Sequence, residues 1–135
     1  MRRNNYSGFV KLMGEEDRFS IIEADNYTLS LAVLKRYEEA KALFRRTIPV
    51  AQKVLGESDE LTLRLRWGYA EALYKADGAT LGDLRQAVTT LEDTARIARR
   101  VLGGAHPLVG LMEGGALRNS RAALRAREAS SAGRT

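Results

Sequence analysis

Apolar residues recur every three or four positions in several long stretches of the chain, which is the pattern of amphipathic helices. The clearest stretch covers 37–55, where Ala40, Phe44 and Ala51 share one face and charged residues occupy the other. Apolar positions follow the same rhythm over 83–102. The pattern therefore predicts an all-α protein.

Five helices are predicted, each from its apolar spacing and from the residues that start or stop it. They span 19–34, 37–55, 59–75, 83–102 and 107–127. Pro49 should bend the second helix without ending it, because the apolar rhythm continues past it. Thr80 and Asp83 have the spacing of a capping box ahead of the fourth helix. Pro107 suits the first position of the last helix.

A glycine marks three junctions with similar neighbours. Gly56 follows Gly14 by 42 positions, and Gly103 follows Gly56 by 47 positions. Glycine suits the left-handed position after a helix, and after the first junction Asp17 is expected to cap a new helix. A repeat period of this size indicates stacked pairs of helices.

The junctions and the segments between them resemble the tetratricopeptide repeat, in particular the longer 42-residue variety of kinesin light chains. The matching residues are Arg36-Tyr37-Glu38-Glu39-Ala40, Val54-Leu55-Gly56, Thr62-Leu63, Tyr69-Ala70, Ala87, Val101-Leu102-Gly103 and His106-Pro107. The resemblance covers about residues 12–124. It implies a solenoid of helical hairpins with about two full repeats and a C-terminal capping helix. Lys35 stands where the family usually has Gly, and Gly68 and Gly115 stand where it usually has Asn.

The repeat domain is predicted to cover 14–129. Residues 1–13 are expected to be a frayed remnant of a preceding helix, and 130–135 a disordered tail. About three repeats are normally needed for independent stability, so the last helix should cover the fourth. A homodimer is a second way to cover that end.

The resemblance further implies that the first helix of each pair lines a concave groove for an extended or helical peptide. Carried over position by position, the groove candidates are Asp25, Asn26, Arg64, Trp67, Gly68, Glu71, Tyr74, Lys75, Arg118 and Arg121. Asn26 alone keeps the amide that binds a peptide backbone in the family. Cations outnumber carboxylates in this set, which favours an acidic partner segment, with Trp67 and Tyr74 as apolar anchors. The alternative is that these side chains form solvated helix faces or helix–helix contacts.

Composition narrows the classes of function. With 44% apolar and 29% charged residues, the 135-residue chain has the balance of a globular domain. It contains no cysteine, which excludes disulfides and thiolate metal sites and is compatible with the cytoplasmic location that we expect. No apolar run reaches the roughly 20 residues of a membrane span. No apolar block follows Arg2 and Arg3, so we expect neither a secretory signal nor a membrane partner.

The net charge of +5 is concentrated near the C-terminus, where 118–135 carries five arginines and one glutamate. This segment offers an alternative function, the binding of anions or nucleic acid. A nearly neutral body and few interleaved aromatic residues argue against nucleic acid as the main partner. The single histidine, His106, has no nucleophile or second ligand nearby and is expected to be a turn residue. We therefore predict a protein-binding scaffold that is not an enzyme and holds no metal or cofactor.

Overall fold

The structure, a computed structural model, describes the backbone of residues 6–133 and the side chains of residues 18–133. The helices are α1 (Tyr6–Val33), α2 (Tyr37–Val54), α3 (Glu60–Lys75), α4 (Leu81–Leu102), α5 (Pro107–Gly110), the π-helical turn η1 (Leu111–Ala116) and α6 (Leu117–Gly133). Within this described part there is no strand, so the all-α prediction is confirmed. The same part contains no helix with the length and apolar character needed to cross a bilayer.

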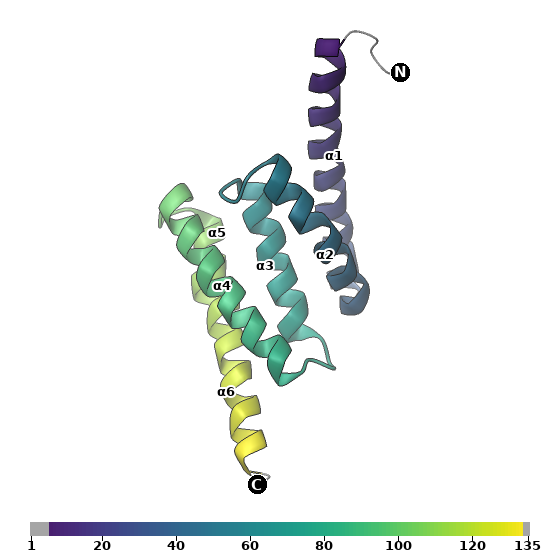
Figure 1. The fold of residues 1–135 in the computed structure, drawn as a ribbon. Helices are drawn as coiled ribbons and strands as arrows, with labels where there is room; N and C mark the ends of the chain where they lie inside the picture. Colours follow the sequence, from purple (N-terminus) through teal and green to yellow (C-terminus); the bar gives the residue numbers. More distant parts are fainter. Residues whose placement is uncertain (1–5, 134–135) are drawn as a thin grey trace.

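Helices that follow one another along the chain pack side by side and run in alternating directions (Figure 1). The order across the molecule is α1, α2, α3, α4 and then α6, with the two chain ends at opposite extremes. Each helix thus packs mainly against its neighbours in sequence, which is the arrangement of a helical solenoid. The helices predicted at 37–55, 59–75 and 83–102 correspond to α2, α3 and α4.

Helix α3 lies at the centre of the hydrophobic core. Its Leu65 packs with α1 and α2, its Leu73 with α4 and α6, and its Leu63 with α4, α5 and η1. On the far side, α6 covers α4 through Leu117 and Leu124. The last helical segment therefore caps the solenoid, as predicted.

At the junctions, Gly56 and Gly103 both take the positive φ angles that favour glycine. Their φ angles are +96° and +91°, in the region that favours glycine. The N–H of Gly56 donates to the carbonyl of Gln52 at 3.1 Å, and that of Gly103 to the carbonyl of Arg99 at 3.0 Å. Each glycine thus takes the positive φ angle at which its helix ends, although the ψ of 151° at Gly103 lies outside the αL conformation.

Side chains start the next helices by accepting backbone hydrogen bonds. Asp59 accepts from the N–H two residues further on at 2.9 Å, and Nδ1 of His106 does the same at 3.1 Å. Thr80 and Asp83 form the predicted capping box, with both hydrogen bonds at 3.0 Å. These caps satisfy N–H groups that have no partner within the helix.

The structure differs from the prediction at Gly14. Helix α1 is continuous over Tyr6–Val33, so Gly14 lies inside a helix and Asp17 does not begin one. A glycine inside a helix costs about 1 kcal/mol relative to alanine. A turn at this point would give up several backbone hydrogen bonds of the helix, each worth about 1 kcal/mol. Continuing the helix is therefore the smaller cost, and α1 begins well before the predicted 19–34.

The chain ends also differ from the prediction. Of the segment 1–13, the residues from Tyr6 onward are helical, while 1–5 lie outside the described residues. Helix α6 continues to Gly133, so the predicted disorder does not hold for 130–133, and 134–135 are not described. The stretch just before this end, 116–129, is rich in alanine and arginine and favours helix, and extending an existing helix is easier than starting one.

Two helices contain residues that commonly interrupt a helix. Helix α2 runs through Pro49 without ending, while a bend at this residue stays a prediction. Pro107 takes the first position of the last helix, as predicted. The wider turn η1 was not predicted, although its glycines, Gly114 and Gly115, have low helix propensity and so weaken regular α-helix there.

Candidate functional site

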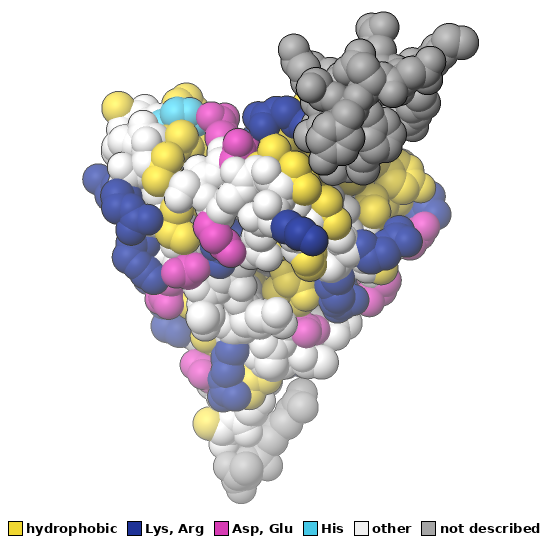
Figure 2. Space-filling view, turned by 45° about the horizontal axis from the view of Figure 1, so that its top comes forward, with side chains coloured by type: hydrophobic (Ala, Val, Ile, Leu, Met, Phe, Trp, Pro, Cys, Tyr) yellow, Lys and Arg dark blue, Asp and Glu magenta, His cyan; other side chains and the backbone are white. Residues whose placement is uncertain are grey.

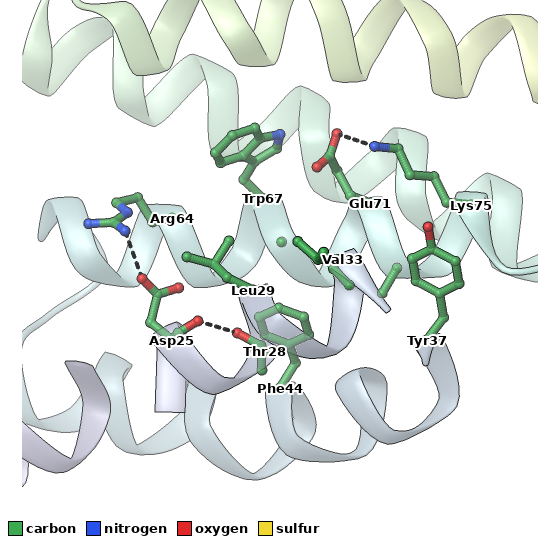
Figure 3. A pocket seen from close by; sticks show the side chains of 13 residues that line it. Asp25, Thr28, Leu29, Val33, Tyr37, Phe44, Arg64, Trp67, Glu71 and Lys75 are labelled. Carbon is green, nitrogen blue, oxygen red and sulfur yellow. Dashed lines mark hydrogen bonds and ion pairs between the residues drawn. The ribbon is translucent and has the colours of Figure 1, made fainter. Parts of the chain in front are cut away.

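An apolar groove lies between α1 and α3 and has a volume of about 290 Å³ (Figure 3). We call it the α1–α3 groove. It is lined by Asp25, Thr28, Leu29, Ala32, Val33, Tyr37, Phe44, Arg64, Trp67, Gly68, Glu71, Ala72 and Lys75. Helices α1 and α3 form its walls, and residues of α2 close its base.

Gly68 and Phe44 make the base of the groove. A Cβ atom at Gly68 would lie 2.6 Å from Cζ of the buried Phe44 ring. The ring therefore occupies the space that a side chain at position 68 would need, and a larger residue would force it to move. This contact explains why position 68 holds glycine, whereas the repeat that the sequence resembles usually has asparagine there.

One end of the groove is built around a buried carboxylate. Arg64 Nη2 donates to Asp25 Oδ2 at 2.8 Å (Figure 3). Burial raises the pKa of Asp25 above its usual 3.8, and the positive charge of Arg64 opposes this shift. The Arg64 side chain is 42% exposed, so the groove presents part of a guanidinium held in place by Asp25.

The other end of the groove contains a second ion pair. Lys75 Nζ lies 3.4 Å from Glu71 Oε2, and the Tyr74 hydroxyl donates to the same oxygen at 3.3 Å. Burial, together with the negative charge of Glu71, raises the pKa of Tyr74. Because each end pairs one cation with one carboxylate, the groove is close to neutral.

Exposed apolar side chains lie between these two ends. Leu29 and Val33 belong to the wall formed by α1, yet half or more of each is exposed. Trp67 stands on the facing wall, where it also packs against the core between α3, α4 and η1. Its Nε1 is buried without a hydrogen-bond partner among the described residues. Trp67 therefore both packs against the core and lines the groove, and the sequence did not decide between these two roles.

The structure brings together six of the ten predicted groove residues. These are Asp25, Arg64, Trp67, Gly68, Glu71 and Lys75, which all line the α1–α3 groove. Residues of α1 and α3 meet in the groove because they lie about one repeat apart in the sequence. Residues one repeat apart take equivalent positions on the first helices of adjacent repeats.

The other four predicted residues do not line the groove. Tyr74 lies beside it and reaches it through Glu71. Asn26 is exposed on α1. Arg118 and Arg121 belong to α6, where Arg121 Nη2 donates to Glu92 of α4 at 2.9 Å. The cationic excess of the predicted set therefore does not collect in the groove.

Sequence reasoning missed the apolar part of the lining. Leu29, Val33, Tyr37 and Phe44 have the spacing of ordinary core residues, and only the positions of α1, α2 and α3 show which of them stay uncovered. A signal was available in the four-residue spacing of Leu29 and Val33, which places both on one face of α1.

The arginine-rich C-terminal helix makes contacts within the fold. Arg127 Nη1 donates to the carbonyl of Ala79 at 2.6 Å, and Arg85 lies 3.7 Å from Glu128. On the face shown in Figure 2, basic and acidic side chains are interspersed. Within the described residues, no group of three His, Asp or Glu side chains is placed to hold a metal ion.

A tetratricopeptide repeat family model matches residues 29–60. The matched segment contains the end of α1, all of α2 and the junction at Gly56. It supports a tetratricopeptide repeat protein with an all-α helical solenoid fold. A search of curated proteins found no match, and neither did a search of solved structures.

Proposed function

We propose that this tetratricopeptide repeat domain is a non-catalytic scaffold that binds a protein or peptide segment in the α1–α3 groove. Tetratricopeptide repeats generally mediate interactions between proteins, and the matched segment supplies part of the groove. The main support is the combination of exposed Leu29 and Val33 with an anchored Arg64 across one concave surface. Concave apolar surfaces with a few fixed polar groups are typical binding sites.

The partner should contribute at least one bulky apolar side chain. Covering Leu29, Val33 and the exposed part of Trp67 removes apolar surface from water, which stabilises a complex by about 25 cal/mol per Å² before the costs of association. A partner that buries roughly 200 Å² here gains about 5 kcal/mol from this contribution. We therefore expect apolar side chains to supply most of the affinity.

We also propose a preference for an acidic group at the Arg64 end. The exposed part of the guanidinium can donate to a carboxylate, and Asp25 holds it in position. Lys75 offers a second cation at the other end of the groove. Because each cation already has a carboxylate partner, we expect the preference to be modest, on the order of 1 kcal/mol.

The proposal is tested with peptides selected on an array of random sequences and then measured by fluorescence anisotropy. Val33→Glu places a charge in the groove at an exposed position, so the fold should tolerate it. Val101→Glu is the matched control, because Val101 is an exposed valine of α4 outside the groove. We expect Val33→Glu to weaken binding at least about tenfold and the control to leave it unchanged. Equal effects of the two variants would contradict the proposal.

The acidic preference has its own pair of variants. Arg64→Gln removes a groove cation, whereas Arg118→Gln removes an exposed arginine of α6 outside the groove. Acidic peptides should lose affinity with Arg64→Gln, and their neutral counterparts should not. If both peptide types respond alike, the groove binds without a charge preference. Far-UV circular dichroism checks that each variant remains folded.

A further inference from the structure

Helix α1 carries an apolar stripe that the rest of the described chain leaves uncovered. The stripe consists of Phe19, Ile22, Asn26, Leu29 and Val33, and its four apolar members are between 40% and 81% exposed. Successive members are three, four, three and four residues apart. This alternation is the seam of a coiled coil, in which the residues take the a and d positions of the heptad.

The opposite side of α1 is already in use. Ile21, Thr28 and Leu31 are buried and face α2 and α3. In the heptad defined by the stripe they take the c and f positions, on the side of the helix away from the seam. One helix thus has two apolar sides, of which the fold covers one, and a helix of this kind usually has a second packing partner.

We propose that α1 pairs in parallel with α1 of a second copy of this chain, forming a short two-stranded coiled coil. Asn26 occupies an a position between Ile22 and Leu29. In a parallel pair the two Asn26 side chains face each other and can hydrogen-bond, whereas an antiparallel pair places each opposite an apolar d residue. A single asparagine at an a position is a known determinant of register and of the dimeric state.

Two exposed charges beside the stripe also suit a parallel pair, while Asp25, at the next g position, is buried against Arg64. Arg18 takes a g position and Glu23 the e position five residues later. In a parallel coiled coil a g residue lies next to the following e residue of the other helix, so Arg18 meets Glu23 of the second copy on both sides of the seam. Arg18 is about half exposed and touches Asp59 only loosely, at 3.6 Å, so it can turn toward the second copy.

The size of the stripe sets the expected strength of the pair. At these exposures the four apolar side chains leave roughly 400 Å² per copy uncovered, about half of what each partner buries in a standard interface. Patches of this size commonly mark interaction sites. We therefore expect a reversible dimer at micromolar concentrations. Leu29 and Val33 also line the α1–α3 groove, so a second copy and a partner peptide would compete for them; the pairing is inferred from the stripe and does not rest on peptide binding.

Disulfide trapping tests the register directly, since the chain has no cysteine of its own. In the parallel pair, the two copies of position 26 lie within the Cα separation of about 4.4–6.8 Å that a disulfide requires. Asn26→Cys should therefore form a covalent dimer under mild oxidation. Tyr27→Cys is the matched control, because Tyr27 is exposed on α1 but lies off the stripe. Equal crosslinking of both variants, or none in Asn26→Cys, would overturn the proposal.

Sedimentation equilibrium measures the pairing without a crosslink. Ile22→Glu should raise the dissociation constant of the dimer at least about tenfold. Arg18→Glu and Glu23→Arg should each weaken self-association, and a mixture of the two should restore it by recreating both ion pairs. A wild-type protein that stays monomeric at high micromolar concentration would refute the pairing. Ile22 does not line the groove, so peptide binding by Ile22→Glu tests the proposed function separately.

Discussion

Lys35 is expected to be a source of strain that a single substitution can relieve. It has a φ of +60°, in the left-handed region that side chains other than glycine disfavour. Its N–H donates to Ala32 O at 2.9 Å, and the N–H of Arg36 donates to Leu31 O at 2.8 Å. These two bonds form the helix-ending motif in which glycine is the usual residue. Lys35→Gly should therefore stabilise the protein.

The expected magnitude follows from two opposing effects. The left-handed conformation costs a residue with a Cβ atom roughly 1–2 kcal/mol. Glycine loses more backbone freedom on folding, which costs about 0.4–1 kcal/mol. The free energy of unfolding of Lys35→Gly should thus exceed that of the wild type by about 0.5–1 kcal/mol.

Urea unfolding followed by circular dichroism at 222 nm measures this difference. Lys35→Ala is the matched control, because it also removes the charged side chain but keeps the Cβ atom and its strain. Thermal unfolding should show Lys35→Gly melting about 2–4 °C above the wild type. If Lys35→Gly and Lys35→Ala prove equally stable, the connection between α1 and α2 does not hold residue 35 in the left-handed conformation and the reasoning fails.

Two further predictions concern stability. Thr80→Ala removes the capping box of α4 and should lower the free energy of unfolding by about 1 kcal/mol in a urea titration; an unchanged midpoint would show that the cap contributes nothing. Because burial raises the pKa of Asp25 in the folded state, the carboxyl binds its proton more tightly there than in the unfolded chain. Its contribution to stability should therefore fall as pH rises from about 3.8 through the raised pKa. As pH rises across this window, the free energy of unfolding of Asp25→Asn should increase relative to that of the wild type. If it decreases instead, the attraction between Arg64 and the carboxylate outweighs the effect of burial on the pKa of Asp25.

Sequence predicted the junctions well where local chemistry decides the backbone. At Gly56 and Gly103 a glycine ends one helix and a side chain caps the next within a few residues. Gly14 has similar neighbours but lies inside α1. The conformation at Gly14 depends on packing with residues distant in the sequence, and the local pattern does not contain that information.

In the groove too, some contacts could be predicted from the sequence and others depend on tertiary packing. Asp25 and Arg64 are 39 positions apart, and the repeat register was enough to place them together. In contrast, Ile21 and Ile22 are identical neighbours in α1, yet the first is buried and the second is exposed. Only the placement of α2 and α3 decides which face of α1 is covered. The sequence alone therefore could not show which apolar residues line the groove and which belong to the core.

Prediction of groove residues from the repeat register failed for the third repeat. Arg118 and Arg121 were assigned to the groove as if the last helix continued the pattern of α1 and α3. In the structure α6 packs over α4, and Arg121 pairs with Glu92 of that helix. Because α6 packs over α4, Arg121 contacts that helix and does not line the groove between α1 and α3.

The central claim is that the α1–α3 groove binds a partner segment, and Trp67 reports on it directly. Trp67 is the only tryptophan of the chain and lines the groove, so its fluorescence needs no added label. On titration with an array-selected peptide that lacks tryptophan, its emission should shift to shorter wavelength with the midpoint found by anisotropy. A peptide that binds while the emission of Trp67 stays unchanged would contradict the account.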